Sequence, residues 1–521
     1  MHALGALDSP PPSDVSPIPN QSNPMSLPKT SPITTRHVVA LPFPGRGHIN
    51  PMMCLCNSLA SLNPAAYNTD IIVTFIVTEE WLGFIGSEPK PDNASFATIP
   101  NVIPSEIGRG ADSPGFYETV LRKIKTPVED LLDRLQPPVA ALIADTYLVW
   151  SVEIGNARNI PVASLWTMSA SVYSVFHFFD LLVQHSHFPV DLEERGEEHV
   201  DYIPGLPSTR VADLPTCFHG KGVNALDRAL ESVASLSKAQ FFNFMIYMQD
   251  ELGSQNLYCD NYNKALLVQF GRTWVSKTRC LYELEAQVID ALRANTSIPV
   301  YHIGPTIPHS KVEAESRPSE ARYFDWLDKQ PIGSVLYVSQ GSLHSAPKAQ
   351  MDEIADGLRE SKVRFFWVAR EAASELKERC GEMGIVVPWC DQLRVLCHDS
   401  IGGFWSHCGW NSTSEAVFAG LPMLTFPIYW DQVPNSKMIV EDWKIGWRVK
   451  KKGVGEEESL VGREEIAGIV RRFMDLESEE GKEMRRKARE LRDIYRQAIR
   501  KGGSTYANLE AFVSDICKQD F

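Results

Sequence analysis

The chain has 521 residues, of which 44% are hydrophobic and 22% charged, as expected of a soluble globular enzyme with two domains. Its net charge of -14 argues against nucleic acid or an anionic membrane as a partner. No apolar run is long enough to be a transmembrane segment, and the first residues lack the pattern of a secretory signal. The ten cysteines show no paired spacing, so we expect free thiols and a cytoplasmic location. We also expect a monomer.

The amino-terminal half begins with a tail and continues as alternating strands and helices. Residues 1–35 are rich in Pro and Ser, which predicts a disordered tail. Asn50 and Pro51 suit the N-cap and first turn of a helix over 51–62, and another helix is expected over 147–157. Apolar runs predict strands at 37–43, 70–78, 138–145 and 161–166. Such alternation indicates a parallel sheet covered by helices.

The alternation restarts in the carboxyl-terminal half, after a polar stretch at 308–322 that is typical of a linker. An amphipathic helix is predicted at 348–361, and strands are predicted at 334–342, 364–370, 384–390 and 401–407. The fold class is therefore α/β, with two doubly wound Rossmann-like domains facing across a cleft. Ligands of such sheets bind beyond the carboxyl ends of the strands, so the loops there are the places to search.

The turn after the strand at 401–406 has the chemistry of a phosphate site. It holds His407 and Gly409, and a helix is expected to start near Asn411, where unpaired backbone N–H groups would face an anion. Gly409 would let a ligand approach the backbone closely. An alternative without any ligand remains open, because Ser412 and Glu415 have the spacing of a capping box.

The 44 residues from Trp389 to Gln432 resemble the donor-binding signature of plant family 1 UDP-glycosyltransferases. The resemblance implies a GT-B type fold and a UDP-sugar donor without a further cofactor or metal. The matching positions, all in register, are Trp389, Gln392, His407, Gly409, Trp410, Asn411, Ser412, Glu415, Asp431 and Gln432.

The resemblance also implies a role for each residue. It assigns the uracil to Trp389 and the Cys390 backbone, the ribose to Gln392 and Glu415, the diphosphate to His407, Asn411 and Ser412, and the sugar to Trp410, Asp431 and Gln432. These roles fit the chemistry of a flat ring for a base, a carboxylate for hydroxyls and donors for phosphate. Gln at the last signature position implies UDP-glucose. Ser342, in the loop that ends the stretch at 334–342, is a further candidate for a nucleotide contact.

His48 follows the first strand and is the candidate catalytic base, because a neutral imidazole can take a proton from an acceptor hydroxyl. Asp145 ends the strand at 138–145 and would orient the imidazole. Taken alone, His48 is compatible with a structural role and Asp145 with a helix N-cap. The GHINP motif around His48 resembles the family's catalytic loop, which supports the pair. Thr167, Ser169 and Ser171 are weaker candidates for lining the sugar or acceptor site.

The expected organisation is an acceptor-binding domain at 36–305, a UDP-sugar-binding domain at 306–490 and helices at 491–521 that pack back on the first domain. Residues 245–279 depart from the family pattern, as either an insertion or a translated intron. The expected activity is inverting transfer of glucose from UDP-glucose to a hydroxyl or carboxyl of a small plant metabolite such as a phenolic, flavonoid, terpenoid or hormone. The alternatives are another UDP-sugar donor, or an inactive regulator that binds a nucleotide sugar.

Overall fold

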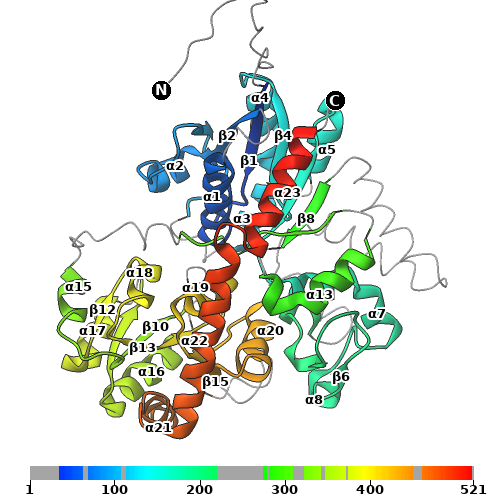
Figure 1. Cartoon of the computed structure of the whole chain (residues 1–521). Helices are drawn as coiled ribbons and strands as arrows, with labels where there is room; N and C mark the ends of the chain where they lie inside the picture. The colour runs from blue at the N-terminus through cyan, green and yellow to red at the C-terminus, as the bar shows by residue number, and fades with distance from the viewer. Residues whose placement is uncertain are drawn as a thin grey trace, which may run out of the picture.

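The structure is a computed structural model that forms two lobes, each built on a parallel sheet (Figure 1). We call them the N-lobe, which carries strands β1 to β9, and the C-lobe, which carries strands β10 to β15. The structure describes residues 34–62, 69–106, 113–148, 150–219, 274–278, 281–296, 299–304, 306–308, 322–341, 346–370, 373–449 and 460–518.

The N-lobe sheet has the strand order β3-β2-β1-β4-β5-β8-β9, with parallel pairing throughout. Its strands are β1 (Thr34–Leu41), β2 (Thr69–Thr78), β3 (Ala94–Ile99), β4 (Val139–Asp145), β5 (Val162–Trp166), β8 (Trp274–Thr278) and β9 (Tyr301–His302). A separate antiparallel pair is formed by β6 (His199–Val200) and β7 (Thr209–Arg210). β1 and β4 are neighbours, so the residues that follow them meet at one edge of the sheet.

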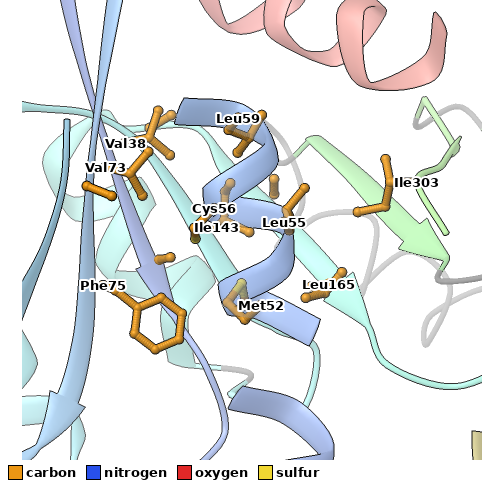
Figure 2. Close-up of a cluster of buried hydrophobic side chains, with 14 of the residues drawn as sticks. Val38, Met52, Leu55, Cys56, Leu59, Val73, Phe75, Ile143, Leu165 and Ile303 are labelled. Atoms are coloured by element: carbon orange, nitrogen blue, oxygen red, sulfur yellow. The ribbon is translucent and has the colours of Figure 1, made fainter. Parts of the chain in front are cut away.

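Helices and short 3-10 turns cover this sheet and extend beside it. They are α1 (Arg46–Ser61), α2 (Glu79–Ile85), α3 (Ser113–Lys123), α4 (Lys125–Leu132), α5 (Trp150–Arg158), α6 (Ala170–His177), α7 (Phe179–Gln184), α8 (Leu192–Arg195), η3 (Val211–Asp213), η4 (Thr216–Phe218) and α13 (Tyr282–Ala294). The helix α1 packs one apolar face on the sheet, where Met52, Leu55 and Leu59 meet Val38 and Ile143 (Figure 2). This burial follows from the spacing of the apolar residues along α1.

The C-lobe sheet is also parallel, with the order β12-β11-β10-β13-β14-β15. Its strands are β10 (Val335–Ser339), β11 (Arg364–Val368), β12 (Gly384–Val387), β13 (Ile401–Ser406), β14 (Met423–Thr425) and β15 (Gly446–Arg448). Every residue of β10 and β13 is buried, as expected of central strands covered on both faces.

The C-lobe sheet is covered by helices on both faces. The elements are α15 (Arg322–Leu327), α16 (Lys348–Ser361), α17 (Ala373–Cys380), η5 (Gly381–Met383), α18 (Gln392–Leu396), α19 (Trp410–Ala419), α20 (Gln432–Lys437), the π-helix η6 (Met438–Asp442), α21 (Arg463–Phe473) and α22 (Glu479–Ile499). From α22 the chain rises to α23 (Ser504–Lys518), which packs on the N-lobe (Figure 1). In this contact Asn508 bonds His302 of β9 at 3.0 Å. Among the described residues, no helix combines the length and apolarity needed to cross a membrane.

Glu285 joins α13 to the N-terminus of α6. Its buried carboxylate accepts hydrogen bonds from the backbone N–H of Ser171 at 2.8 Å and from the Ser171 hydroxyl at 2.7 Å. The N–H of Ala170 is a third donor, at 3.3 Å. A carboxylate satisfies the unpaired N–H groups of a helix start and interacts favourably with the helix dipole there. Glu285 thereby fixes α6 behind the loop that carries Thr167.

The structure differs from the sequence-based expectation at two boundaries. Thr34 and Thr35 pair with β2 and belong to the sheet, whereas the rest of the expected tail lies outside the described residues. Residues 274–278 form β8 between β5 and β9, so they are part of the N-lobe sheet. The rest of the stretch at 245–279 lies outside the described residues, so its interpretation as an insertion or a translated intron stays a prediction.

Candidate active site

A cavity of about 440 Å³ lies between the two lobes and is lined by residues of both. The sequence-predicted residues that line it are His48, Thr167, Trp389, Cys390, Gln392, His407, Gly409, Trp410, Asn411, Ser412, Glu415 and Asp431. The structure therefore brings the two motif regions together, although one follows β1 and the other follows β13. Ser342 lies outside the described residues.

His48 and Asp145 form a pair at the N-lobe side of the cavity, in which Asp145 is buried and His48 is partly exposed. The Nδ1 atom of His48 lies 2.7 Å from Oδ2 of Asp145 and 3.2 Å from the Thr167 hydroxyl. The other oxygen of Asp145 accepts the backbone N–H of Tyr147 at 3.0 Å, which fixes the carboxylate. Nε2 of His48 makes no hydrogen bond within the described part of the chain. A carboxylate on Nδ1 leaves Nε2 as the acceptor of a proton.

The helix that carries His48 starts earlier than the sequence indicates. Its N-cap is Gly45, and Pro51 lies inside α1 instead of at its first position. Because Pro51 has no N–H, the carbonyl of Gly47 four residues before it lacks a helical donor. The side-chain amide of Asn411, from the C-lobe, donates to this carbonyl at 3.1 Å. The prediction of Asn50 as N-cap was wrong, since the helix already begins four residues earlier.

His407 is partly buried between two glycines, in the turn that precedes α19. Burial lowers its pKa to about 4, so the imidazole is neutral near pH 7 and would meet a phosphate as an uncharged donor. A Cβ atom at Gly341 or at Gly409 would lie 2.5 Å from Nε2 of His407. A side chain at either position would therefore displace the His407 ring. Nδ1 of His407 is buried without a hydrogen-bond partner among the described residues.

The helix α19 does not begin with a capping box. Its N-cap is Gly409, which offers no side chain, and Ser412 already lies in the first turn. The Ser412 hydroxyl accepts from Nε2 of Gln392 at 2.9 Å, and the same Nε2 lies 2.7 Å from the Glu415 carboxylate. The first turn of α19 lines the cavity, where an anion would interact favourably with the positive end of the helix dipole.

Trp389 and Cys390 lie side by side at the rim but differ in exposure. Trp389 is 59% exposed, which is unusual for a large aromatic ring and suits a platform that stacks on a base. The Cys390 thiol is buried, and this burial raises its pKa to about 12, so it is neutral near pH 7.

Asp431 and Gln432 are both buried at the start of α20, but only Asp431 lines the cavity. Burial raises the pKa of Asp431 to about 6, although hydrogen bonding from Asn435 opposes the shift. The side-chain carbonyl of Gln432 accepts the backbone N–H groups of Ile428 and Tyr429 at 2.8 and 3.1 Å. Gln432 therefore shapes the loop before Asp431.

The remaining serine candidates do not line the cavity. Ser169 is the N-cap of α6 and accepts the N–H of Val172. Ser171 is the residue that Glu285 binds. Of the three positions weighed after β5, only Thr167 reaches the cavity, where it contacts His48.

Comparisons with known proteins show the family to which the chain belongs. A family described as UDP-glucoronosyl and UDP-glucosyl transferase matches residues 312–454. UDP-glycosyltransferase 87A2 of Arabidopsis thaliana is 49% identical over 484 residues, covering 92% of this chain and 97% of its own length. The chain belongs to the plant family 1 UDP-glycosyltransferases.

Solved members of this glycosyltransferase family share the fold. UGT71G1 of Medicago truncatula, solved with UDP-glucose, is 24% identical, with a TM-score of 0.70 and coverage of 93% of this chain and 98% of its own. UGT2 of Phytolacca americana, solved with UDP-2fluoro-glucose and pterostilbene, is 24% identical, with a TM-score of 0.69 and coverage of 93% and 100%. The predicted GT-B fold and glycosyltransferase class are confirmed, whereas the role of each site residue stays a prediction.

Sequence reasoning missed several aromatic residues of the glycosyltransferase cavity. The ring of His48 lies 5.1 Å from Phe43 and 5.5 Å from Tyr147, measured between ring centroids. Trp430 reaches the same end of the cavity from the C-lobe. Phe43 and Tyr147 each lie within a few residues of a predicted catalytic residue, so proximity in sequence was an available signal. Trp430 gave no such signal beyond its place in the signature.

Proposed function

We propose that this enzyme transfers glucose from UDP-glucose to a hydroxyl group of a small acceptor, with inversion at the anomeric carbon. The observation that carries the proposal is the 2.7 Å contact between His48 and Asp145 at the wall of a cavity that the donor signature also lines. The solved relatives bound to UDP-glucose and to UDP-2fluoro-glucose support a glucose donor.

In the proposed reaction, the acceptor hydroxyl gives its proton to Nε2 of His48 while its oxygen forms a bond to the anomeric carbon. The bond from that carbon to the β-phosphate oxygen breaks on the opposite face, and UDP leaves with the electron pair. Asp145 stabilises the imidazolium that forms. The start of α19 and the neutral His407 would stabilise the charge that develops on the leaving diphosphate.

We infer that the acceptor is apolar around its reactive hydroxyl. The cavity wall near His48 includes Phe43, Leu121, Tyr147 and Met168. Such a wall buries an aromatic or terpenoid skeleton but leaves a strongly hydrated acceptor unsatisfied. The pterostilbene bound by the Phytolacca americana relative has this character. A carboxyl acceptor is the second candidate, because a carboxylate needs no base. The cytoplasmic location and the monomeric state stay predictions.

The deciding experiment compares His48→Ala with the unaltered enzyme. Removing a general base is expected to lower the rate of glucose transfer to a hydroxyl by about 10² to 10⁴-fold. The affinity for UDP, measured by calorimetry, should stay the same because His48 lies on the N-lobe side. The anomeric proton coupling of the product reports inversion. Unchanged turnover in His48→Ala would remove this residue from the mechanism.

A panel of UDP-sugars separates the alternatives. UDP-glucose, UDP-galactose, UDP-xylose and UDP-glucuronate would be offered at equal concentration, and released UDP would be measured. Faster use of any of the last three would contradict the glucose assignment. UDP binding without transfer from any donor to hydroxyl or carboxyl acceptors would favour the inactive regulator.

A further inference from the structure

Trp430 belongs to the C-lobe but lies against the N-lobe. Its φ angle is 59°, a left-handed conformation that a bulky residue rarely adopts. Two backbone contacts hold it there: the Trp430 N–H donates to the Thr216 hydroxyl at 2.7 Å, and the Trp430 carbonyl accepts the Thr216 N–H at 3.2 Å. A strained backbone that the surrounding structure maintains is a reason to look for a function.

The indole of Trp430 forms part of the cavity wall near His48. Its Nε1 donates to the hydroxyl of Tyr147 at 3.1 Å, and its ring lies 6.0 Å from that of Phe176. Tyr147 is also the residue whose ring packs 5.5 Å from His48. The Trp430 ring is therefore fixed from two sides and cannot swing away from the cavity without losing its hydrogen bond.

Trp430 is close both to a candidate donor residue and to the candidate catalytic base. It directly precedes Asp431, the candidate sugar ligand, and it lines the same cavity. The indole and the apolar side chains of Phe43 and Leu121 all line this cavity, so we expect an acceptor whose hydroxyl reaches His48 to contact them. Two rigid faces of this kind accept a thin molecule more readily than a thick one.

We propose that Trp430 is an acceptor-specificity residue, which restricts the enzyme to acceptors that are flat around the reactive hydroxyl. This inference rests on the proposed function, since it assumes transfer to a hydroxyl held at His48. The indole acts as a wall, and its hydrogen bond to Tyr147 keeps the wall in place. Packing between the lobes alone would not make the choice of acceptor depend on this side chain.

The test compares one flat and one thick acceptor, 1-naphthol and testosterone, with UDP-glucose as donor. The measured quantity is the ratio of kcat/KM for 1-naphthol to kcat/KM for testosterone. In Trp430→Ala this ratio is expected to fall by about tenfold or more, since pocket shape discriminates by factors of this order. Trp430→Phe, which keeps a flat ring without the N–H, should stay within about threefold of the original ratio. If Trp430→Ala does not fold, Trp430→Leu carries the same expectation.

Binding of UDP gives an independent readout, because the proposed uracil platform Trp389 is a separate residue of the rim. The Kd for UDP in Trp430→Ala should stay within about threefold of the original. An unchanged acceptor ratio in Trp430→Ala, or an equal fall in Trp430→Phe, would overturn the inference. If the unaltered enzyme binds UDP but glucosylates neither acceptor, the proposed function fails, and this inference fails with it.

Discussion

Asp431 offers a test of whether a side chain of the candidate site lowers the stability of the folded protein. Its carboxylate is buried in the C-lobe, and this burial raises its pKa from 3.8 to about 6. Burial disfavours the charged form of a carboxylate, and asparagine carries no charge. Asp431→Asn should therefore stabilise the fold near neutral pH. The same change should weaken binding of UDP-glucose more than binding of UDP, because the proposed role of Asp431 is to hold the sugar.

The expected gain depends on pH in a defined direction. The folded state holds the Asp431 proton more tightly than the unfolded chain, so ionisation costs folding free energy as pH rises from about 4 to above 6. A shift of about two pKa units corresponds to about 3 kcal/mol at pH 8 and about half of that at pH 5. The Asn variant should therefore gain most at pH 8 and little at pH 4.

Urea unfolding of both proteins at pH 5 and pH 8 measures this difference. The midpoint should rise more in Asp431→Asn at pH 8 than at pH 5. Asp70→Asn is a matched control, because Asp70 is an exposed carboxylate on β2. It should change neither midpoint. A loss of stability in Asp431→Asn at pH 8, or a gain that is equal at both pH values, would refute the reasoning.

Two further changes test the surroundings of the site. Gly341→Ala places a Cβ atom 2.5 Å from the His407 ring and should weaken UDP binding by about tenfold or more in calorimetry. Gly381→Ala is the control that separates the steric clash from backbone strain. Gly381 has a positive φ like Gly341, but a Cβ there would have nothing within 4 Å, so this variant should leave UDP affinity unchanged. Glu285→Ala removes the carboxylate that binds Ser171 and should destabilise the fold by about 2 kcal/mol. An unchanged melting temperature for that variant would contradict the capping role.

The fold was predictable because apolar periodicity is a local property of sequence. The helix expected at 348–361 is α16, with the same bounds, and the first residues expected in β11, β12 and β13 are the ones observed. The start of α1 was less predictable, since Pro51 usually marks a first turn. Here it lies inside the helix, because Asn411 satisfies the carbonyl that the proline leaves without a donor. That partner is 364 residues away in the chain.

The candidate site, like the fold, could be predicted from the sequence only in part. The pairing of His48 with Asp145 could be expected, since both follow neighbouring parallel strands and meet at one edge of the sheet. The contact between Trp430 and Tyr147 could not, because it depends on how the two lobes sit against each other. The role of Gln432 at the sugar stays a prediction, and the structure adds that its side-chain carbonyl holds the preceding loop.

The return of α23 to the N-lobe has a practical consequence for handling the protein. Leu509, Phe512 and Val513 lie in the core that α1 and β1 also form, so α23 covers part of the N-lobe, which is synthesised first. During synthesis the apolar residues of the N-lobe that contact α23 therefore remain exposed until α23 has been made. Shortening the carboxyl end would make this exposure permanent and favour aggregation. An affinity tag is better attached at the amino end, ahead of β1.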